Sequence, residues 1–202
     1  MQTANSPCLE SKARLSCISA THLDPESPRR PEAEHFIRTV FHNRYGAEVS
    51  AFAPSLLMLE QQGRIIAATG WRGADIEPLF LESYLDAPIE SVMERLTGQQ
   101  LERQRIVEVG NLASEKPGGS LQIILNLARY LDRLGYEWVV FTATQELIGI
   151  FTKLGLPPLA LAKADPARLS TGTRGWGSYY DTQPVVVTGR IRVALERMGS
   201  EA

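Results

Sequence analysis

The pattern of apolar and polar positions predicts helices and a β-hairpin in the first half of the chain. Apolar residues recur at three- and four-residue spacing in a helix that is expected to begin at Pro31 and end at Gly46. Two apolar runs, separated by a Gln-Gln-Gly turn, predict a hairpin over residues 55–72. The stretch 78–85 ("PLFLESYL") fits either a strand or a helix, and a short helix is expected over residues 88–96.

The second half of the chain alternates between strand-like and helical patterns. The expected strands are "RIVEVGNLA", "EWVVFTAT", "LALA" and "PVVVT". Ser120 is expected to cap the first helix between them and Thr144 the second, and a further helix closes the chain. Strands that alternate with helices, after an antiparallel hairpin, predict an α/β fold with a mixed sheet and a right-handed strand–helix–strand crossover.

One folded domain is expected over residues 31–202, because 202 residues suffice for one well-buried core and are few for two. Residues 1–30 are polar and carry three prolines, so we interpret them as a loose N-terminal arm with a short strand near residues 14–21.

Composition and charge exclude several classes of function. The net charge of −2 and the pI of about 6.0 give no basic field that would attract nucleic acid or anionic lipid. The chain shows no secretory signal and no apolar run long enough to span a membrane. Its two cysteines, Cys8 and Cys17, give no disulfide framework, so we expect a cytoplasmic protein. The three histidines all precede residue 43 without metal-ligand spacing, which predicts no metal site.

The stretch "ASEKPGGS" between the first of these strands and its helix is the main chemical candidate. A Walker A loop needs lysine after the glycines, and a dinucleotide fingerprint needs another glycine spacing, so neither fits. The order of elements fits the pyrophosphate loop of the GNAT N-acyltransferase fold, in which helix N-terminal N–H groups hold the phosphates of an acyl thioester. Lys116, Gly118, Gly119 and Ser120 are the predicted cofactor-binding residues of this loop. The alternative is that Pro-Gly-Gly is an ordinary turn.

Two residues depart from the usual acyltransferase pattern. Glu115 stands where the loop commonly carries Gln or Arg, and Phe151 stands where a tyrosine commonly protonates the departing thiolate. In both respects the chain resembles the acyl-homoserine-lactone synthases, a branch of the GNAT fold that often takes acyl groups from acyl carrier protein.

Residues 31–192 carry several long and unusual strings: "FHNRYGAEVSAF", "AATGWRGA", "EPLFLESYLDAPIE", "VEVGNLAS", "GYEWVVFTAT", "KLGLPPL", "ADPARL" and "WGSYYDTQP". Through these strings the chain resembles a narrower group, the thermostable hemolysin family. The family resembles the autoinducer synthases, so the resemblance implies a GNAT-like acyltransferase fold and leaves the biochemical activity open. The family name implies lysis of red cells, which an amphiphilic acylated product would explain indirectly.

Glu108 is the strongest catalytic candidate. A carboxylate between two valines of a strand is costly unless it has a partner or a use. The resemblance to the synthases' strand motif assigns it to amine binding or general base work; the competing interpretation is a structural ion pair with Arg72 or Arg105. Asn111 and Leu112 are predicted at a strand bulge, where their backbone groups hold the donor and polarise its carbonyl.

The remaining candidates line an amine pocket or donate a proton. Trp71, Arg72 and Glu82 are the predicted substrate-binding residues, although Trp71 also fits the plain core. Tyr179 and Tyr180 are the predicted replacements for the missing proton donor, against a role in aromatic packing.

The sequence thus predicts an enzyme that moves an acyl group from acyl-CoA or acyl-phosphopantetheine on a carrier protein to an amine of a small molecule. The large apolar surface favours acyl groups of medium or long chain. The alternative is a non-catalytic or membrane-active protein that keeps the acyltransferase fold.

Overall fold

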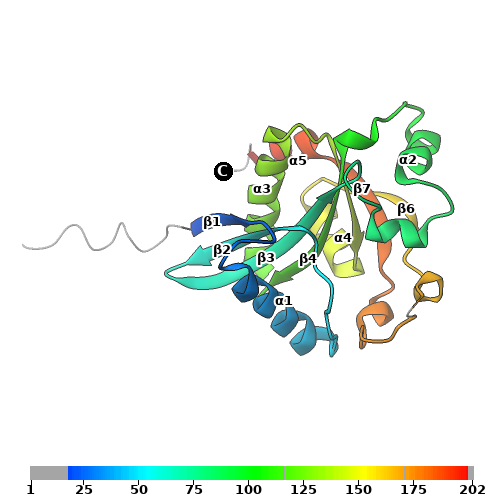
Figure 1. The fold of residues 1–202 in the computed structure, drawn as a ribbon. Helices are drawn as coiled ribbons and strands as arrows, with labels where there is room; N and C mark the ends of the chain where they lie inside the picture. The colour runs from blue at the N-terminus through cyan, green and yellow to red at the C-terminus, as the bar shows by residue number, and fades with distance from the viewer. Residues whose placement is uncertain (1–17, 116, 171, 200–202) are drawn as a thin grey trace, which may run out of the picture.

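In the computed structural model, the chain folds around a seven-stranded sheet with the order β1-β2-β3-β4-β5-β7-β6 (Figure 1). The structure describes residues 18–115, 117–170 and 172–199. The strands are β1 (Ile18–Leu23), β2 (Ser55–Gln61), β3 (Arg64–Gly73), β4 (Ile106–Ser114), β5 (Trp138–Ala143), β6 (Leu159–Lys163) and β7 (Val185–Arg190).

The sheet is mixed, as the sequence predicted. β4 and β5 are parallel and are joined through a helix, whereas every other neighbouring pair is antiparallel. β7 lies between β5 and β6, so the chain crosses from β5 to the edge strand β6 before it returns to fill the gap. The parallel pair therefore lies inside the sheet, between the β2–β3 hairpin and β7.

Helices cover both faces of this sheet (Figure 1). The apolar stripe of α1 packs on one face with Leu56 and Met58 of β2. The stripe of α3, together with α5, packs on the opposite face with Leu57 and Leu59 of the same strand, as the two-residue period of a strand requires. The helices are α1 (Arg30–Tyr45), η2 (Phe80–Tyr84), α2 (Ile89–Thr97), η3 (Arg103–Arg105), α3 (Pro117–Arg133), α4 (Gln145–Lys153), η4 (Pro166–Arg168), η5 (Tyr179–Thr182) and α5 (Ile191–Gly199).

Most predicted elements are confirmed within a few residues, and two expectations need correction. The hairpin is β2 and β3, and Thr144 caps α4 by accepting a bond from the N–H of Leu147. Ser120 does not cap α3, because that helix already begins at Pro117 and the Pro-Gly-Gly stretch forms its first turn. Proline favours this position, since the first N–H of a helix has no partner to lose.

The predicted N-terminal strand is present in the described part of the arm, and residues 14–17 of its expected span lie outside the described residues. It is β1, which begins at Ile18 and pairs with β2 at the edge of the sheet, so part of the predicted arm belongs to the sheet. The ambiguous stretch 78–85 forms the short 3₁₀ helix η2 in the long connection between β3 and β4. This connection, which also carries α2, packs on the same face of the sheet as α1, over the part that α1 does not cover.

Candidate functional site

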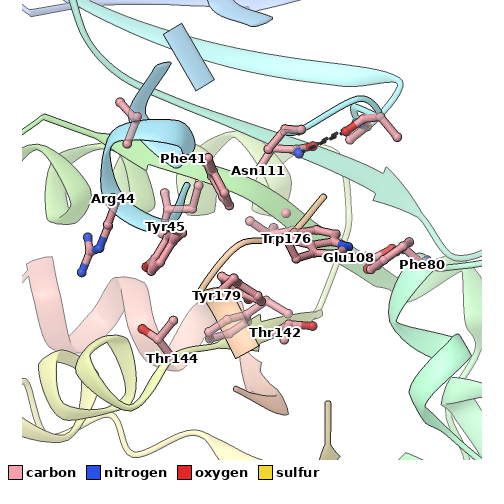
Figure 2. Close-up of a pocket in the computed structure, with 18 of the residues that line it drawn as sticks. Phe41, Arg44, Tyr45, Phe80, Glu108, Asn111, Thr142, Thr144, Trp176 and Tyr179 are labelled. Carbon is pink, nitrogen blue, oxygen red and sulfur yellow. Dashed lines mark hydrogen bonds between the residues drawn. The ribbon is translucent and has the colours of Figure 1, made fainter. Parts of the chain in front are cut away.

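A cavity of about 530 Å³ lies between α1, the connection that carries η2, and the ends of β4 and β5. Figure 2 shows part of its lining, with Phe41, Arg44 and Tyr45 from α1 and with Thr142 and Thr144 from β5 and the start of α4. Tyr179 and Trp176 enter from the β6–β7 connection. Segments that lie far apart in the sequence thus form one cavity.

The cavity reaches the place where β4 and β5 separate. The parallel pairing of these strands runs from Ile106 and Trp138 to Val109 and Phe141, and both strands then continue further. Beyond this point, Asn111 and Leu112 of β4 and Thr142 of β5 line the cavity. A gap between two strands offers main-chain groups to a ligand that lies along it.

A β-bulge accompanies this separation, as the sequence predicted. Ala68 pairs with Ala113 and Gly70 with Gly110, so Asn111 and Leu112 together oppose the single residue Thr69. Asn111 adopts a left-handed φ of 52°, which asparagine tolerates better than most residues.

The side chain of Asn111 points away from the bulge to the loop that follows α1. Its Oδ1 accepts from the N–H of Ala53 at 3.1 Å, and its Nδ2 donates to the carbonyl of Ala51 (Figure 2). The side chain therefore fixes a cavity wall, while the backbone of Asn111 and Leu112 stays along the gap.

Glu108 is 7% exposed, and it lines the cavity at the paired part of β4. Its Oε2 accepts from the N–H of Phe80 at 2.8 Å and lies 3.4 Å from Nε of Arg72, and its Oε1 accepts from the N–H of Leu81 at 3.0 Å. The carboxylate thus holds the first turn of η2. Two carboxylate oxygens offer about four acceptor sites, so Oε1 retains capacity for one more donor.

Burial governs the ionisation of this carboxyl group. Loss of solvation raises the pKa of Glu108, against the opposing effect of Arg72 and of the two backbone N–H donors. The raised pKa moves a carboxylate towards the range in which it acts as a base near neutral pH.

The raised pKa of Glu108 implies that the free energy of unfolding depends on pH. The Glu108 carboxyl stays protonated to a higher pH in the folded protein than in the unfolded chain. Its contribution to stability is therefore greatest below its ordinary pKa of 4.5. It falls as the pH rises through the folded pKa. We therefore expect the difference in free energy of unfolding, wild type minus Glu108→Gln, to decrease from pH 4 towards pH 8 in urea titrations. A difference that increases with pH would show that the donors outweigh burial.

Arg72 lines the cavity beside Glu108, but it also serves a second carboxylate. Its Nη1 lies 3.0 Å from Glu77, while its Nε faces Glu108. The ion pair between Arg72 and Glu108, one of the two predicted structural partnerships, is therefore present. Arg105 pairs instead with Glu102 and Glu137.

Trp71 and Glu82 lie away from the cavity wall. Trp71 points to the opposite face of the sheet, where it packs near His22, Tyr130 and Tyr136, with its Nε1 buried and without a hydrogen-bond partner among the described residues. Glu82 accepts from the N–H groups of Leu79 and Ile89, and it forms an ion pair with Arg103. Neither residue lines this cavity, and each makes structural contacts in this geometry.

The two predicted proton donors differ in their access to the cavity. Tyr179 lines it and packs against Phe41 and Tyr45 of α1, and burial raises the pKa of its hydroxyl. The hydroxyl of Tyr180 lies 2.6 Å from that of Tyr84, a cavity-lining residue of η2. Burial first, and then the contact with Tyr180, raises the pKa of Tyr84.

Part of the predicted phosphate-binding loop lines the cavity, at the start of α3. Ser114 at the end of β4 and Ser120 in the first turn of α3 line the cavity, and Gly118 and Gly119 belong to the same turn. Lys116 lies outside the described residues. Phe151 packs its ring 5.5 Å from that of Phe141, so the position of the usual tyrosine is part of an aromatic contact between α4 and β5.

Sequence reasoning missed Tyr84, Phe80 and Trp176. Phe80 is 42% exposed and lines the cavity, and its ring lies 6.1 Å from that of Trp176. The available signal was the density of aromatic residues in "LFLESYL" and "WGSYYD", two segments that the fold brings together.

Neither a metal-binding cluster nor a helix that could span a membrane occurs in the described part of the chain. Within residues 18–115, 117–170 and 172–199, there is no group of three or more His, Cys, Asp or Glu side chains that would hold a metal ion. Within the same ranges, no helix has the length and apolar character needed to cross a bilayer.

The fold resembles those of several acyl-transferring enzymes of known structure. The acyl-homoserine-lactone synthase LasI aligns with a TM-score of 0.57 at 15% identity, over 87% of this chain and 89% of its own. FeeM, an N-acyl amino acid synthase from uncultured soil microbes, aligns with a TM-score of 0.59 at 12% identity, over 87% and 91%. The CoA-dependent synthase BjaI, solved with SAM and isopentyl-CoA, aligns with a TM-score of 0.57 at 12% identity, over 92% and 89%.

These identities are low, so the structural likeness shows a GNAT-like acyltransferase fold and leaves the substrates open. No curated protein sequence matches the chain. The family model for thermostable hemolysin matches residues 23–195, which is most of the sequence. The chain therefore belongs to the thermostable hemolysin family.

Proposed function

We propose that this protein transfers an acyl group from a thioester, carried by coenzyme A or by acyl carrier protein, to an amine of a small molecule. The observation that carries the proposal is the cavity itself. Its lining includes both the place where two parallel strands separate and the buried carboxylate of Glu108. A thioester along the gap and an amine beside Glu108 would meet within a single enclosed space.

The end of the cavity near α3 suits the phosphate of the donor. The first N–H groups of a helix are free of intrahelical partners and carry positive potential, which favours a phosphate. Ser114 and Ser120 border this end and add hydroxyl groups. We assign Lys116, Gly118, Gly119 and Ser120 to this site.

The middle of the cavity suits the pantetheine arm and the acyl chain. Backbone groups of Asn111 and Leu112 at the bulge are assigned to the amides of the arm and to the thioester carbonyl. Half-buried apolar side chains of β5 and α4, Phe141, Leu147 and Ile150, border the same space. They favour an acyl chain of medium or long length, because each buried methylene adds favourable transfer energy.

The end near η2 suits the amine. Oε1 of Glu108 accepts the proton of the attacking nitrogen as the new amide bond forms and the bond from carbonyl carbon to sulfur breaks. The departing thiolate then takes a proton from a tyrosine hydroxyl, for which Tyr179, on the wall, and Tyr180, linked to the wall by Tyr84, are the candidates. Exchange with water afterwards removes the proton from Glu108 and restores the one on the tyrosine. Arg72 keeps Glu108 oriented through its ion pair.

Thiol release is the direct test. The purified protein is incubated with octanoyl-CoA, or with octanoyl acyl carrier protein, and a panel of small amines, and free thiol is followed with a chromogenic disulfide. We expect release that depends on both the donor and one class of amine. Absence of release with every pair, together with absence of binding of either donor, would contradict the proposal.

The alternative is a non-catalytic or membrane-active protein with the same fold. Leakage of dye from vesicles of phosphatidylcholine and phosphatidylglycerol, measured without thioester, separates the two. Leakage that persists in Glu108→Gln would support the alternative, whereas leakage only after an acyl transfer reaction would support an amphiphilic product.

A further inference from the structure

Residues 172–183, which we call the roof segment, close one side of the cavity. The segment lies in the connection between β6 and β7 and includes η5. Its residues Arg174, Gly175, Trp176 and Tyr179 line the cavity, although they follow Glu108 by more than sixty positions in the sequence. Their place over the cavity therefore depends on contacts with other elements.

The first set of contacts joins the roof segment to the C-terminal end of α1. The carbonyl of Tyr45, the last residue of α1, accepts from the N–H of Ser178 at 2.8 Å and from its hydroxyl at 3.2 Å. The N–H of Glu48 donates to the carbonyl of Gly175 at 2.6 Å. The final carbonyls of a helix have no intrahelical donors, so the roof segment satisfies one of them.

Gly177 allows this approach, and no other residue type fits there without a shift. Its φ is +52°, and a Cβ at this position would overlap the carbonyl of Tyr45 and lie 2.9 Å from the carbonyl oxygen of Gly46. Both obstacles are backbone atoms, which cannot turn aside as a side chain can. Any side chain at residue 177 would lift the segment from α1.

The second set of contacts joins the roof segment to η2. The Tyr180 hydroxyl meets that of Tyr84 at 2.6 Å, and the ring of Trp176 faces that of Phe80. The N–H of Phe80 in turn donates to Glu108, so the indole and the carboxylate border the same end of the cavity (Figure 2). The roof segment thus reaches from α1 to η2, the short helix whose first turn Glu108 holds.

We propose that the roof segment selects the acyl acceptor, with Trp176 as the specificity-determining residue and Gly177 as the residue that positions it. This inference rests on the proposed acyl transfer, because it assigns the Glu108 end of the cavity to the amine. The donor end is formed by α3, α4 and the gap between β4 and β5, none of which the roof segment supplies. Changes at Trp176 and Gly177 are therefore expected to weaken binding of the acceptor and to leave binding of the donor intact.

The same loop offers a matched control for Gly177. Gly172 also has a positive φ, +57°, but a Cβ there would meet no heavy atom within 4 Å in the described part of the chain. Gly177→Ala and Gly172→Ala therefore introduce similar backbone strain. Only Gly177→Ala also disturbs the contacts between the roof segment and the C-terminal end of α1.

Hydrogen exchange in the free protein, without any substrate, tests the contacts between the roof segment and the C-terminal end of α1. In Gly177→Ala we expect the amides of Ser178 and Glu48 to exchange about tenfold faster or more, since each loses its acceptor. The amides of β4 and β5 keep their protection. Gly172→Ala leaves both amides as in the wild type. Equal exchange in the two variants would overturn the role of Gly177.

Kinetics with octanoyl-CoA and the best amine of the panel test the selection. Trp176→Ala and Gly177→Ala should raise the KM for the amine about tenfold or more and leave the KM for the donor unchanged, while Trp176→Phe restores part of the loss. Equal changes in both KM values, or none, would overturn the inference. If the wild type releases no thiol with any amine, both the proposed acyl transfer and the proposed acceptor selection are wrong. Hydrogen exchange still tests whether Gly177 holds the roof segment against α1.

Discussion

Replacing Glu108 by alanine is expected to lower the free energy of unfolding by about 3–5 kcal/mol, which is a large part of the stability of most domains. The change leaves the N–H groups of Phe80 and Leu81 without their acceptor in a buried place. It also leaves Arg72 with Glu77 as its remaining carboxylate partner. Urea denaturation followed by circular dichroism measures the loss.

Glu146→Ala is a suitable control for this experiment. Glu146 also forms an ion pair across the cavity mouth, with Arg44 of α1, but both side chains are exposed, so we expect a change within about 1 kcal/mol. Comparable losses in the two variants would mean that burial of Glu108 does not decide its contribution.

Activity separates the structural role of Glu108 from its chemical one. Glu108→Gln keeps the shape of the side chain but cannot accept a proton from the amine, so we expect acyl transfer to fall by about 10²- to 10⁴-fold while the protein stays folded. Transfer near the wild-type rate in folded Glu108→Gln would leave Glu108 with the structural role alone.

Replacing Arg103 by alanine is the second change for which we expect a large effect. Its guanidinium meets Glu82 and Glu90, and its Nε donates to the carbonyl of Ala74 at 2.6 Å. Without it, two part-buried carboxylates face each other beside η2 and α2. We expect a loss of roughly 2–4 kcal/mol in the free energy of unfolding, measured in urea.

The loss in Arg103→Ala should also reach the cavity, because Glu82 of η2 accepts from the N–H of Leu79 at the start of η2 and from the N–H of Ile89 at the start of α2. Arg64→Ala is the control, since Arg64 is largely exposed and lies 3.8 Å from Glu115. Its stability should stay within about 0.5 kcal/mol of the wild type. A similar loss in both variants would contradict a specific role for Arg103.

The order of elements could be predicted from sequence because most elements have a clear apolar period. The stretch 78–85 could not, because tertiary contacts decide its conformation. Glu108, from a different strand, accepts the N–H groups of Phe80 and Leu81 and so stabilises a helical turn there. A local pattern contains no information about a partner 27 or 28 positions away. The aromatic residues of η2 were missed as cavity residues for the same reason.

Strand geometry separates Trp71 from Arg72, which the sequence analysis had placed in one amine pocket. Neighbours on a strand point to opposite faces of the sheet, so both cannot line the same wall. Arg72 meets Glu108 at the cavity, and Trp71 packs on the other face against aromatic residues of α3 and β1. Glu108 itself was found because a carboxylate in an apolar strand is costly wherever that strand lies.

The position of β7 between β5 and β6 has a consequence for synthesis of the chain. β6 leaves the ribosome before β7, yet within the described residues β7 is the strand through which β6 joins the sheet. β5 likewise has only its β4 side paired until β7 arrives. This side of the sheet therefore assembles only when residues 185–190 have emerged. Until then, two apolar strand edges stay open to other chains, and a chaperone that delays their pairing would protect the nascent protein.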